Sequence, residues 1–591
     1  MKKVNIRIEN HDYQVDNNLT ILNAARLCGY NIPSLCSYHN GECSIGSCRV
    51  CLVEVKGYPN LVASCTRKVS EGMEISISTQ KAINARRISC ELLLSSGHQD
   101  CKTCDKSSRC ELLYVAKQVG VRENGFEGIK IPTTIDMAAP AIFRDSSKCI
   151  LCGRCVVKCE DAQGLGILNF QKRGLKTIVA PVENRSFHDS PCIQCGQCIT
   201  VCPTGALAGH IDMIAVDKAM SEKKTVIVQV APAVRAAIAE EFDEKIGTDG
   251  TGKMVAALRR LGFSKVFDTN FAADLTIMEE ASELIQRVKD GKLPLLTSCS
   301  PGWINYLEYY YPELIKNVSS CKSPHQMMGA MIKSYYAKNM GLDPKDIYVV
   351  SVMPCIAKKY ERQRIENSVD GICDVDAVIT TRGLARMIRR VGLNWQLLPK
   401  EDFDDDFMGK ATGASEIFGS AGGVTEAALR TAYKLMTGYD YGAIEFNEIR
   451  GFNGVKEASI EIGDITLNVA CVSGMKNAKP ILEEIKNGTS KYHFIEMMAC
   501  PGGCVNGGGQ PYVKPMFLPN EDFDILSTYI KKRSSVLYNR DLNSIVRASH
   551  KNPNIIKLYN DFLIGPGSKI AHKYLHTKYN TKREKYPSID V

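Results

Sequence analysis

The stretch EMMACPGGCVNGGG, residues 496–509, places two thiols four positions apart around a Gly-Gly pair and adds three more glycines. Cysteine thiolates are the usual protein ligands of iron–sulfur clusters. Glycine lets the backbone approach a bulky inorganic group and aim N–H donors at it. Alone, the stretch also fits a glycine-rich turn with two buried cysteines, but the other cysteines of the chain favour a cluster site.

The composition indicates a multidomain protein rich in metal ligands. The chain has 591 residues, 44% hydrophobic and 24% charged, with 25 cysteines, and a chain of this length divides into several domains. No apolar run reaches the length of a membrane span, and the N-terminus alternates like a strand without a signal-peptide core. We therefore expect a cytoplasmic protein whose cysteines are metal ligands rather than disulfide partners.

The net charge of +9 is compatible with an anionic partner. Nucleic-acid binding is disfavoured because no block of lysines and arginines is interleaved with aromatic residues. An acidic protein partner fits better, and a charge without any particular partner is the alternative.

Residues 1–80 are predicted to form alternating strands around a cysteine-rich loop. The spacing C-x11-C-x2-C-x13-C resembles the 2Fe–2S domain of plant-type ferredoxins, a β-grasp domain, although the first gap is longer than in ferredoxin itself. A zinc site is the competing interpretation. The expected ligands are Cys36, Cys48, Cys51 and Cys65.

Residues 81–125 begin with a helical pattern and then carry one histidine and three cysteines: His98, Cys101, Cys104 and Cys110. The arrangement resembles the 4Fe–4S segment, ligated by one histidine and three cysteines, that follows the 2Fe–2S domain in complex I large subunits and large iron hydrogenases. Only two residues separate the histidine from the first cysteine, one fewer than in the common pattern. The alternative is a surface histidine beside a three-cysteine site.

The spacing C-x2-C-x2-C-x3-C occurs twice within residues 140–210. This is the pattern of two-cluster bacterial ferredoxins, in which the fourth cysteine of each run binds the other cluster. One predicted 4Fe–4S cluster takes Cys149, Cys152, Cys155 and Cys202, and the other takes Cys192, Cys195, Cys198 and Cys159.

From about residue 211, strand-like and helix-like segments alternate, which predicts an α/β domain with largely parallel sheets. Strands are expected at residues 225–232, 266–268, 294–297, 347–352 and 377–379. Such sheets carry functional groups on the loops at their strand ends. Two of these loops are TSCSPGW, residues 297–303, and MPCIAKKYE, residues 353–361, and the opening stretch is a third.

These three loops together resemble the signature motifs of the FeFe-hydrogenases, and the preceding segments resemble those of the large clostridial type with four accessory clusters. The resemblance implies an α/β catalytic domain over residues 211–520, with residues 521–591 as its helical C-terminal wrap. It also implies an H-cluster: a 4Fe–4S cube joined through a cysteine to a two-iron site with CO, cyanide and a bridging dithiolate amine. By position, Cys355, Cys500 and Cys504 are ligands, Lys358 donates to a cyanide, and the pocket is lined by Met353, Met498 and Phe418.

Ser300 departs from the family pattern. The first motif usually has two adjacent cysteines, a proton-relay thiol and then the fourth ligand of the cube, but here Cys299 is followed by Ser300. A serine oxygen is a harder ligand than sulfur, and its hydroxyl is far less acidic than a thiol. Three readings stay open: Ser300 binds through oxygen, Cys299 or Cys321 substitutes for it, or the cube is impaired.

The resemblance also implies a proton route, which by position includes Cys299, Glu280, Ser319, Glu283 and, at the surface, Arg287. The two glutamates lie three positions apart on an expected helix, residues 278–289, so they share one face. From the residues alone, such a pair is more often a solvated face. Because Ser320 is adjacent to Ser319, the serine of this route is either of the two.

The implied activity is that of a ferredoxin hydrogenase, which reversibly reduces protons to H2. Electrons would come from ferredoxin or a similar acidic carrier through one 2Fe–2S and three 4Fe–4S clusters, and maturation proteins would supply the two-iron site. Neither nucleic acid nor membrane is expected as a partner. One alternative is a hydrogen-sensing or H-cluster-impaired relative, favoured by Ser300. The other is an electron-transfer iron–sulfur subunit, which Lys358 and the 496–509 stretch disfavour.

Overall fold

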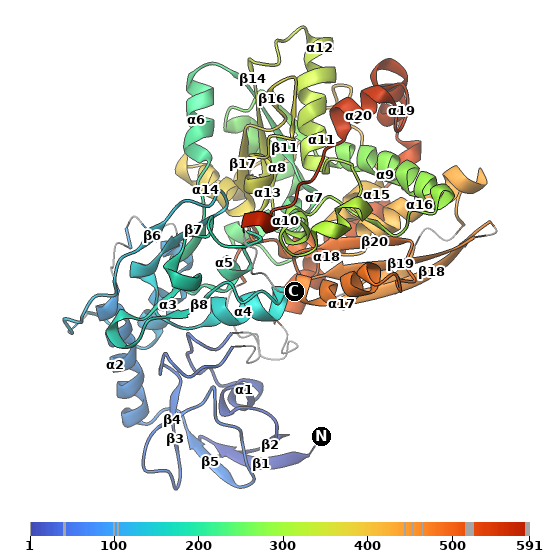
Figure 1. Ribbon diagram of the computed structural model, residues 1–591. Helices are drawn as coiled ribbons and strands as arrows, with labels where there is room; N and C mark the ends of the chain where they lie inside the picture. Colours follow the sequence, from blue (N-terminus) through green and yellow to red (C-terminus); the bar gives the residue numbers. More distant parts are fainter. Residues whose placement is uncertain are drawn as a thin grey trace.

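The computed structural model describes residues 2–585 except 39–42, 98–100, 103, 105, 124, 443–444, 452–453, 464 and 514–524. The N-terminal sheet lies at one end of the molecule and the cysteine-rich segments follow it. The region from residue 211 onward, which is expected to be the catalytic domain and is called the catalytic region below, forms the other end (Figure 1). Among the described residues, no helix combines the length and apolarity needed to cross a membrane.

The N-terminal domain is a five-stranded sheet in the order β2-β1-β5-β3-β4. Strand β1 alternates exposed and buried residues, and its Val4, Ile6 and Ile8 enter the core. It pairs antiparallel with β2 and parallel with β5. Thr20 caps helix α1 by accepting the Asn23 N–H. The bounds are β1 Lys3–Ile8, β2 His11–Asp16, α1 Ile21–Leu27, β3 Leu52–Val55, β4 Val62–Ala63 and β5 Met73–Ser76.

The cysteine-rich segments are short helices around small sheets. Strands β10, β7 and β6 form one three-stranded sheet, and β8 and β9 form a hairpin in the long stretch between the two cysteine runs. The bounds are α2 Gln80–Ser96, α3 Glu111–Gln118, β6 Ile135–Asp136, β7 Ile142–Asp145, α4 Arg154–Gln163, β8 Asn169–Gln171, β9 Ile178–Ala180, α5 Gln197–Val201 and β10 Leu207–Gly209.

The catalytic region has two four-stranded sheets. The first, in the order β12-β11-β14-β17, is parallel throughout and buried on both faces. The second, in the order β13-β20-β19-β18, contains an antiparallel pair, β18 and β19, that the sequence analysis did not anticipate. Five strands lie where they were expected: β11 Thr225–Val230, β12 Lys265–Asp268, β13 Leu295–Leu296, β14 Ile347–Met353 and β17 Ala377–Thr380.

Helices cover both sheets. The expected helix at 278–289 is the end of the longer α9, Asn270–Asp290. The remaining elements used below are α10 Pro301–Tyr310, α11 Pro324–Met331, α13 Lys358–Glu361, α14 Thr381–Arg390, α16 Gly423–Thr437, β18 Val455–Ile462, β19 Ile465–Ser473, α17 Met475–Lys486 and β20 Phe494–Met498.

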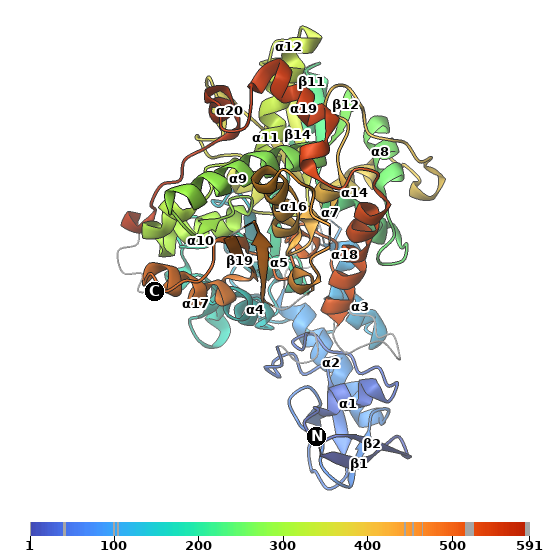
Figure 2. The ribbon, with the colours of Figure 1, turned by 90° about the vertical axis from the view of Figure 1, so that its right-hand side faces the viewer.

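The C-terminal helices α18 Ile525–Asn543, α19 Pro553–Leu558 and α20 Lys569–Leu575 lie along the outside of the catalytic region (Figure 2). Helix α18 is anchored by Arg533, whose side chain is 1% exposed and pairs with Glu240 at 2.8 and 2.6 Å. The same guanidinium donates to the carbonyls of Val505 and Pro511. The segment is therefore joined to the catalytic core by buried charge-assisted hydrogen bonds.

Candidate metal centres and active site

The four N-terminal cysteines lie together in the interior. Cys36, Cys48, Cys51 and Cys65 are all buried. Hydrogen bonds from Cys48 and then Cys65 lower the pKa of Cys36, and a hydrogen bond from Cys65 lowers that of Cys51. The same hydrogen bonds, together with burial, raise the pKa of Cys48 and of Cys65, so two of the four thiols favour the thiolate form that binds iron and two favour the thiol.

The next segment approaches the ferredoxin-like region closely. Cys104 and Cys110 are near enough for the charge of Cys104 to act on Cys110, whose pKa is raised mainly by burial. A Cβ atom at Gly205 would lie 2.6 Å from Cys104 Sγ, so this glycine lets the two regions touch. Cys101 is partly buried, and His98 lies outside the described residues.

The two ferredoxin-like runs bring their cysteines together in the crossed sets that their spacing predicts. Cys149, Cys152, Cys155 and Cys202 line one cavity of about 30 Å³. Around the other position, Cys192, Cys195 and Cys159 act electrostatically on Cys198, and burial is the main cause of its raised pKa. Both groups thus provide four sulfur donors around one place.

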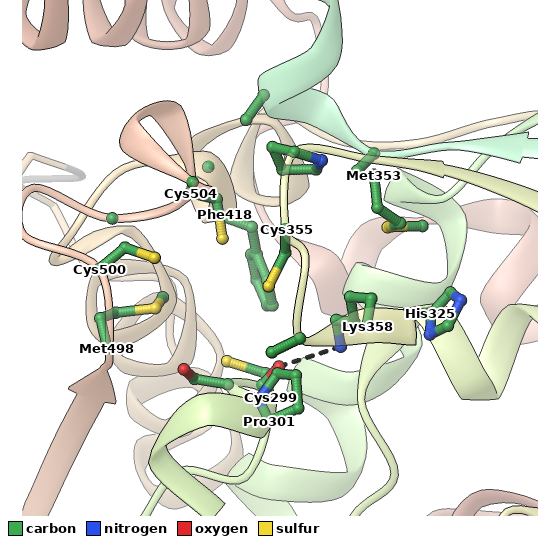
Figure 3. A pocket seen from close by; sticks show the side chains of 18 of the residues that line it. Cys299, Pro301, His325, Met353, Cys355, Lys358, Phe418, Met498, Cys500 and Cys504 are labelled. Carbon is green, nitrogen blue, oxygen red and sulfur yellow. Dashed lines mark hydrogen bonds between the residues drawn. The ribbon is translucent and has the colours of Figure 1, made fainter. Parts of the chain in front are cut away.

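The catalytic cavity has a volume of about 90 Å³ and almost entirely apolar walls. The thiols of Cys355, Cys500 and Cys504 face a common space, with Phe418 and Met498 beside them (Figure 3). The further predicted residues on its wall are Cys299, Ser300, Met353 and Lys358. Loops at the carboxyl ends of strands from both sheets converge here: β14 of the first sheet leads into Met353 and Cys355, and β20 of the second leads into Met498 and Cys500.

Lys358 enters this cavity from a polar network behind it. Its ammonium donates to the Cys299 carbonyl at 3.1 Å and to Glu361 at 2.9 and 3.0 Å (Figure 3 shows the first bond). Burial raises the pKa of Glu361, but the charge of Lys358 and a hydrogen bond from His325 outweigh it and lower that pKa to about 2. A charged Glu361 therefore fixes the cation at the cavity wall.

His325 also lines the cavity, although both its ring nitrogens are engaged elsewhere. Nδ1 lies 2.8 Å from Glu361 Oε2 and Nε2 lies 2.7 Å from Ser351 Oγ. The imidazole thus supports Glu361 and presents a carbon edge to the cavity.

Ser300 stands where the fourth ligand is expected. It precedes α10, and its hydroxyl accepts the Ala499 N–H at 3.2 Å, beside Cys500. Cys321, one of the substitutes considered above, is absent from the cavity wall and lies buried behind Ser298, whose hydroxyl donates to its carbonyl at 2.7 Å. The geometry therefore leaves Ser300 and Cys299 as the nearest candidates.

The proposed proton-route residues lie in spatial succession. Burial, and then the charge of Glu283, raises the pKa of Glu280 to about 8, and Glu280 in turn acts on the Cys299 thiol. Ser319 Oγ donates to Glu283 Oε2 at 2.8 Å and also contacts Glu280. Arg287 forms an ion pair with Glu283. Ser319, rather than Ser320, thus supplies the hydroxyl between the glutamates.

Five domain models match consecutive parts of the chain. The model described as "Iron only hydrogenase large subunit, C-terminal domain" matches residues 224–508, and "Iron hydrogenase small subunit" matches 527–582. A 2Fe–2S cluster binding domain matches 1–80, an iron–sulfur binding region of NADH-ubiquinone oxidoreductase matches 86–124, and a 4Fe–4S dicluster domain matches 148–206.

Two relatives match nearly end to end. "NADP-reducing hydrogenase subunit HndD" of Solidesulfovibrio fructosivorans is 45% identical over 98% of this chain and 99% of its own length. "Iron hydrogenase 1" of Clostridium pasteurianum is 41% identical over 97% of this chain and 99% of its own. The chain belongs to the FeFe-hydrogenases. A solved apo FeFe-hydrogenase from Chlamydomonas reinhardtii, 41% identical, covers 62% of this hydrogenase and 98% of itself with a TM-score of 0.54.

The donor sets of this hydrogenase fit the clusters of its family. No three described His, Cys, Asp or Glu side chains meet tightly enough for a single metal ion, whereas a cluster spreads its cysteines over several irons. At the catalytic cavity, three thiols and one hydroxyl surround an apolar space several times the size of a water molecule. The ligand chemistry of the cavity therefore fits a cluster.

Sequence reasoning missed several residues around the hydrogenase cavity. Ser298 and Glu361 lie inside two of the quoted loops and His325 belongs to no recognisable spacing, and only their hydrogen bonds reveal what these three side chains do. One further part of the wall could have been predicted from its place at the end of an expected strand: residues 231–233, which follow β11, also line the cavity. The C-terminal wrap, in which the sequence showed no chemistry, places His576 beside Ser320.

Proposed function

We propose that this hydrogenase interconverts protons and H2 at the cavity lined by Cys299, Lys358 and Cys504. The observation that carries the proposal is the convergence of three thiols and one ammonium on a small apolar cavity that adjoins a buried glutamic acid. The H-cluster, when bound there, supplies the redox chemistry of H2. The protein contributes ligands, hydrogen-bond donors, water exclusion and proton transfer.

Cys355, Cys500 and Cys504 would hold the cluster, and Lys358 would stabilise anionic groups on it. A compact ammonium suits a cyanide ligand, and Glu361 keeps it in place. Met353, Met498 and Phe418 would exclude water with soft, apolar surface.

Glu280 would exchange protons with Cys299 on the cavity wall. With a pKa of about 8 it is mainly protonated at neutral pH, so it can give a proton to the thiolate and recover one through Ser319. Glu283 would be the next group outward, oriented by Arg287. General acid–base groups of this kind act best when their pKa lies near the working pH.

The accessory clusters would form an electron path of one 2Fe–2S and three 4Fe–4S centres. Contacts support such a path, because both preceding segments reach the ferredoxin-like region: Cys43 Sγ lies 3.9 Å from the Cys152 carbonyl, and Gly205 adjoins Cys104. Cys195 lines the catalytic cavity itself, so the ferredoxin-like region ends at the site.

We propose a reduced ferredoxin or similar acidic carrier as the electron donor, because the chain carries a net charge of +9. A second candidate is a nicotinamide-linked partner subunit, since one near full-length relative is named an NADP-reducing hydrogenase subunit. H2 oxidation with either acceptor decides between them. Transfer to ferredoxin by the chain alone supports the first, and transfer only in the presence of a nicotinamide-binding partner supports the second. The cytoplasmic location and the need for maturation proteins stay predictions.

The function is tested by H2 evolution from reduced methyl viologen after maturation with the assembled two-iron site. We expect turnover together with CO and cyanide bands in the infrared. A fully metallated protein without either would overturn the proposal. Bands with slow turnover and a response to H2 would instead favour a hydrogen-sensing role, the reading that Ser300 keeps open.

Ser300 is proposed to bind the cube through its oxygen. The hydroxyl already lies at the Ala499 N–H beside Cys500, and an oxygen ligand is harder than sulfur. Ser300→Cys should change the Mössbauer spectrum of the cube and raise its reduction potential, with the iron count unchanged. Identical spectra in parent and variant would exclude the oxygen ligand.

A further inference from the structure

Arg287 lies at the outer end of the proposed route but cannot pass a proton. Its guanidinium donates to Glu283 at 3.0 and 2.8 Å and to the carbonyls of Lys316 and Val318 at 3.0 and 2.9 Å. A guanidinium stays protonated in proteins, so these four bonds make it an anchor. Protons therefore reach Glu283 either from water at its partly exposed side chain or from another titratable group.

Ser320 connects Glu283 to a histidine. Its N–H donates to Glu283 Oε2 at 3.2 Å, and its hydroxyl lies 2.8 Å from His576 Nδ1. A rotation between staggered positions about the Cα–Cβ bond moves this hydroxyl relative to both groups. Two backbone bonds hold the C-terminal segment here, from Thr577 to the Ser320 carbonyl at 2.8 Å and from Lys322 to the Leu575 carbonyl at 2.7 Å.

His576 is oriented from its other side by a buried carboxylate. Nε2 lies 3.1 Å from Glu279 Oε2, while Tyr559 donates to Glu279 Oε1 at 2.6 Å and the Gly567 N–H donates to Oε2 at 2.8 Å. An acceptor at Nε2 keeps a hydrogen on that nitrogen, which leaves Nδ1 to exchange a proton with Ser320.

His572 brings the site to the surface. It is exposed, and its ring lies against that of His576, tilted by 34° with centroids 4.0 Å apart. The pair is carried by α20 and the residue that caps it, in the segment that wraps the catalytic region (Figure 2). Imidazole is the side chain that changes charge near neutral pH, which suits it to take protons from water.

We propose that His576, with His572, collects solvent protons for Glu283. This inference rests on the proposed function and its proton route. A proton from water binds the imidazole pair; His576 Nδ1–H then gives a proton to Ser320 Oγ as the serine hydroxyl gives its own to Glu283. His576 returns to neutral, one proton has moved inward, and no heavy-atom bond has changed. H2 oxidation uses the same steps in reverse.

The test is His576→Ala in the matured full-length hydrogenase, assayed for H2 evolution from reduced methyl viologen in dilute buffer. We expect a loss of about a hundredfold, the lower end of what a positioned acid–base group contributes. Added imidazole should restore the rate in a saturable way, which a purely structural defect would not allow. Iron content and infrared bands should match those of the parent.

His550→Ala is the matched control. This histidine belongs to the same C-terminal region but bonds Asp440 at 3.1 Å and Thr431 at 3.4 Å, so its variant should keep the parent rate and ignore imidazole. If His576→Ala fails to mature, His576→Gln is assayed in its place, because glutamine keeps hydrogen-bonding groups but does not titrate. A lowered rate of H2 evolution in this variant supports the inference.

Two results would overturn the inference alone: an unchanged rate in either His576 variant, or a slow His576→Ala with intact bands that imidazole does not restore. A parent enzyme that evolves no H2 would overturn the proposed function and this inference with it.

Discussion

Glu280 shows how one side chain acquires its role from its surroundings. It is fully buried, and its Oε2 has no hydrogen-bond partner among the described residues. Burial, and then the charge of Glu283, raises its pKa to about 8. Spacing alone placed these two glutamates on one face of a helix, but only burial distinguishes a proton carrier from a solvated pair.

The pKa of Glu280 predicts a pH dependence. Its carboxylic-acid band in the infrared should disappear as the pH rises through about 8, and H2 evolution should fall with it because the protonated donor is lost. The raised pKa also makes the stability of the folded protein depend on pH. The contribution of protonated Glu280 to that stability is fully present below the ordinary pKa of a glutamic acid and is lost as the pH rises through about 8. Glu280→Gln should lack this carboxylic-acid band at every pH. A band that persists in the variant would belong to another acid.

At the scale of elements, the catalytic cavity depends on loops held by helices from distant parts of the chain. Arg533 on α18 donates to the Val505 carbonyl, immediately after Cys504, and pairs with Glu240 near the first sheet. The wrap therefore supports the loop that carries two proposed ligands. A helical wrap was expected from resemblance, whereas this link was not, because no sequence spacing relates Arg533 to Glu240.

Arg533→Ala should destabilise the catalytic region. It leaves Glu240 buried without its partner, which costs about 3–5 kcal/mol in comparable pairs. The midpoint of thermal inactivation should fall by several degrees. Lys551→Ala removes an ion pair that is half-exposed, with Lys551 50% and Asp440 48% exposed, and should shift the midpoint little. Equal shifts in the two variants would contradict the structural role of Arg533.

At the scale of the whole molecule, the cysteine-rich segments and the catalytic region form a continuous series of contacts. Cluster ligands within a run lie close in sequence, and the crossed sets that the spacing of the ferredoxin-like runs predicts lie together in the structure. Spacing could not choose a replacement for the missing cysteine at 300. The structure narrows that choice, since Cys321 lies away from the cavity wall.

Gly205→Ala should interrupt this series at one point. The added Cβ would lie 2.6 Å from Cys104 Sγ, too close for either atom to stay in place. We expect altered paramagnetic resonance of one or both neighbouring clusters, with infrared bands of the two-iron site unchanged. Gly442→Ala, which meets no atom within 4 Å, is the control. Unaltered cluster signals in Gly205→Ala would show that the two segments are further apart than the structure has them.

The turn at Cys195 and Gly196 has a consequence for engineering. A Cβ at Gly196 would lie 3.0 Å from Ile356, and one at Gly508 would lie 2.7 Å from the Cys195 carbonyl. The last part of the proposed electron path thus also forms part of the wall of the catalytic cavity. A chimera that joins a foreign ferredoxin module to this enzyme must therefore retain the turn at Cys195 and Gly196. A different turn there would open the wall of the catalytic cavity to which the module is meant to deliver electrons.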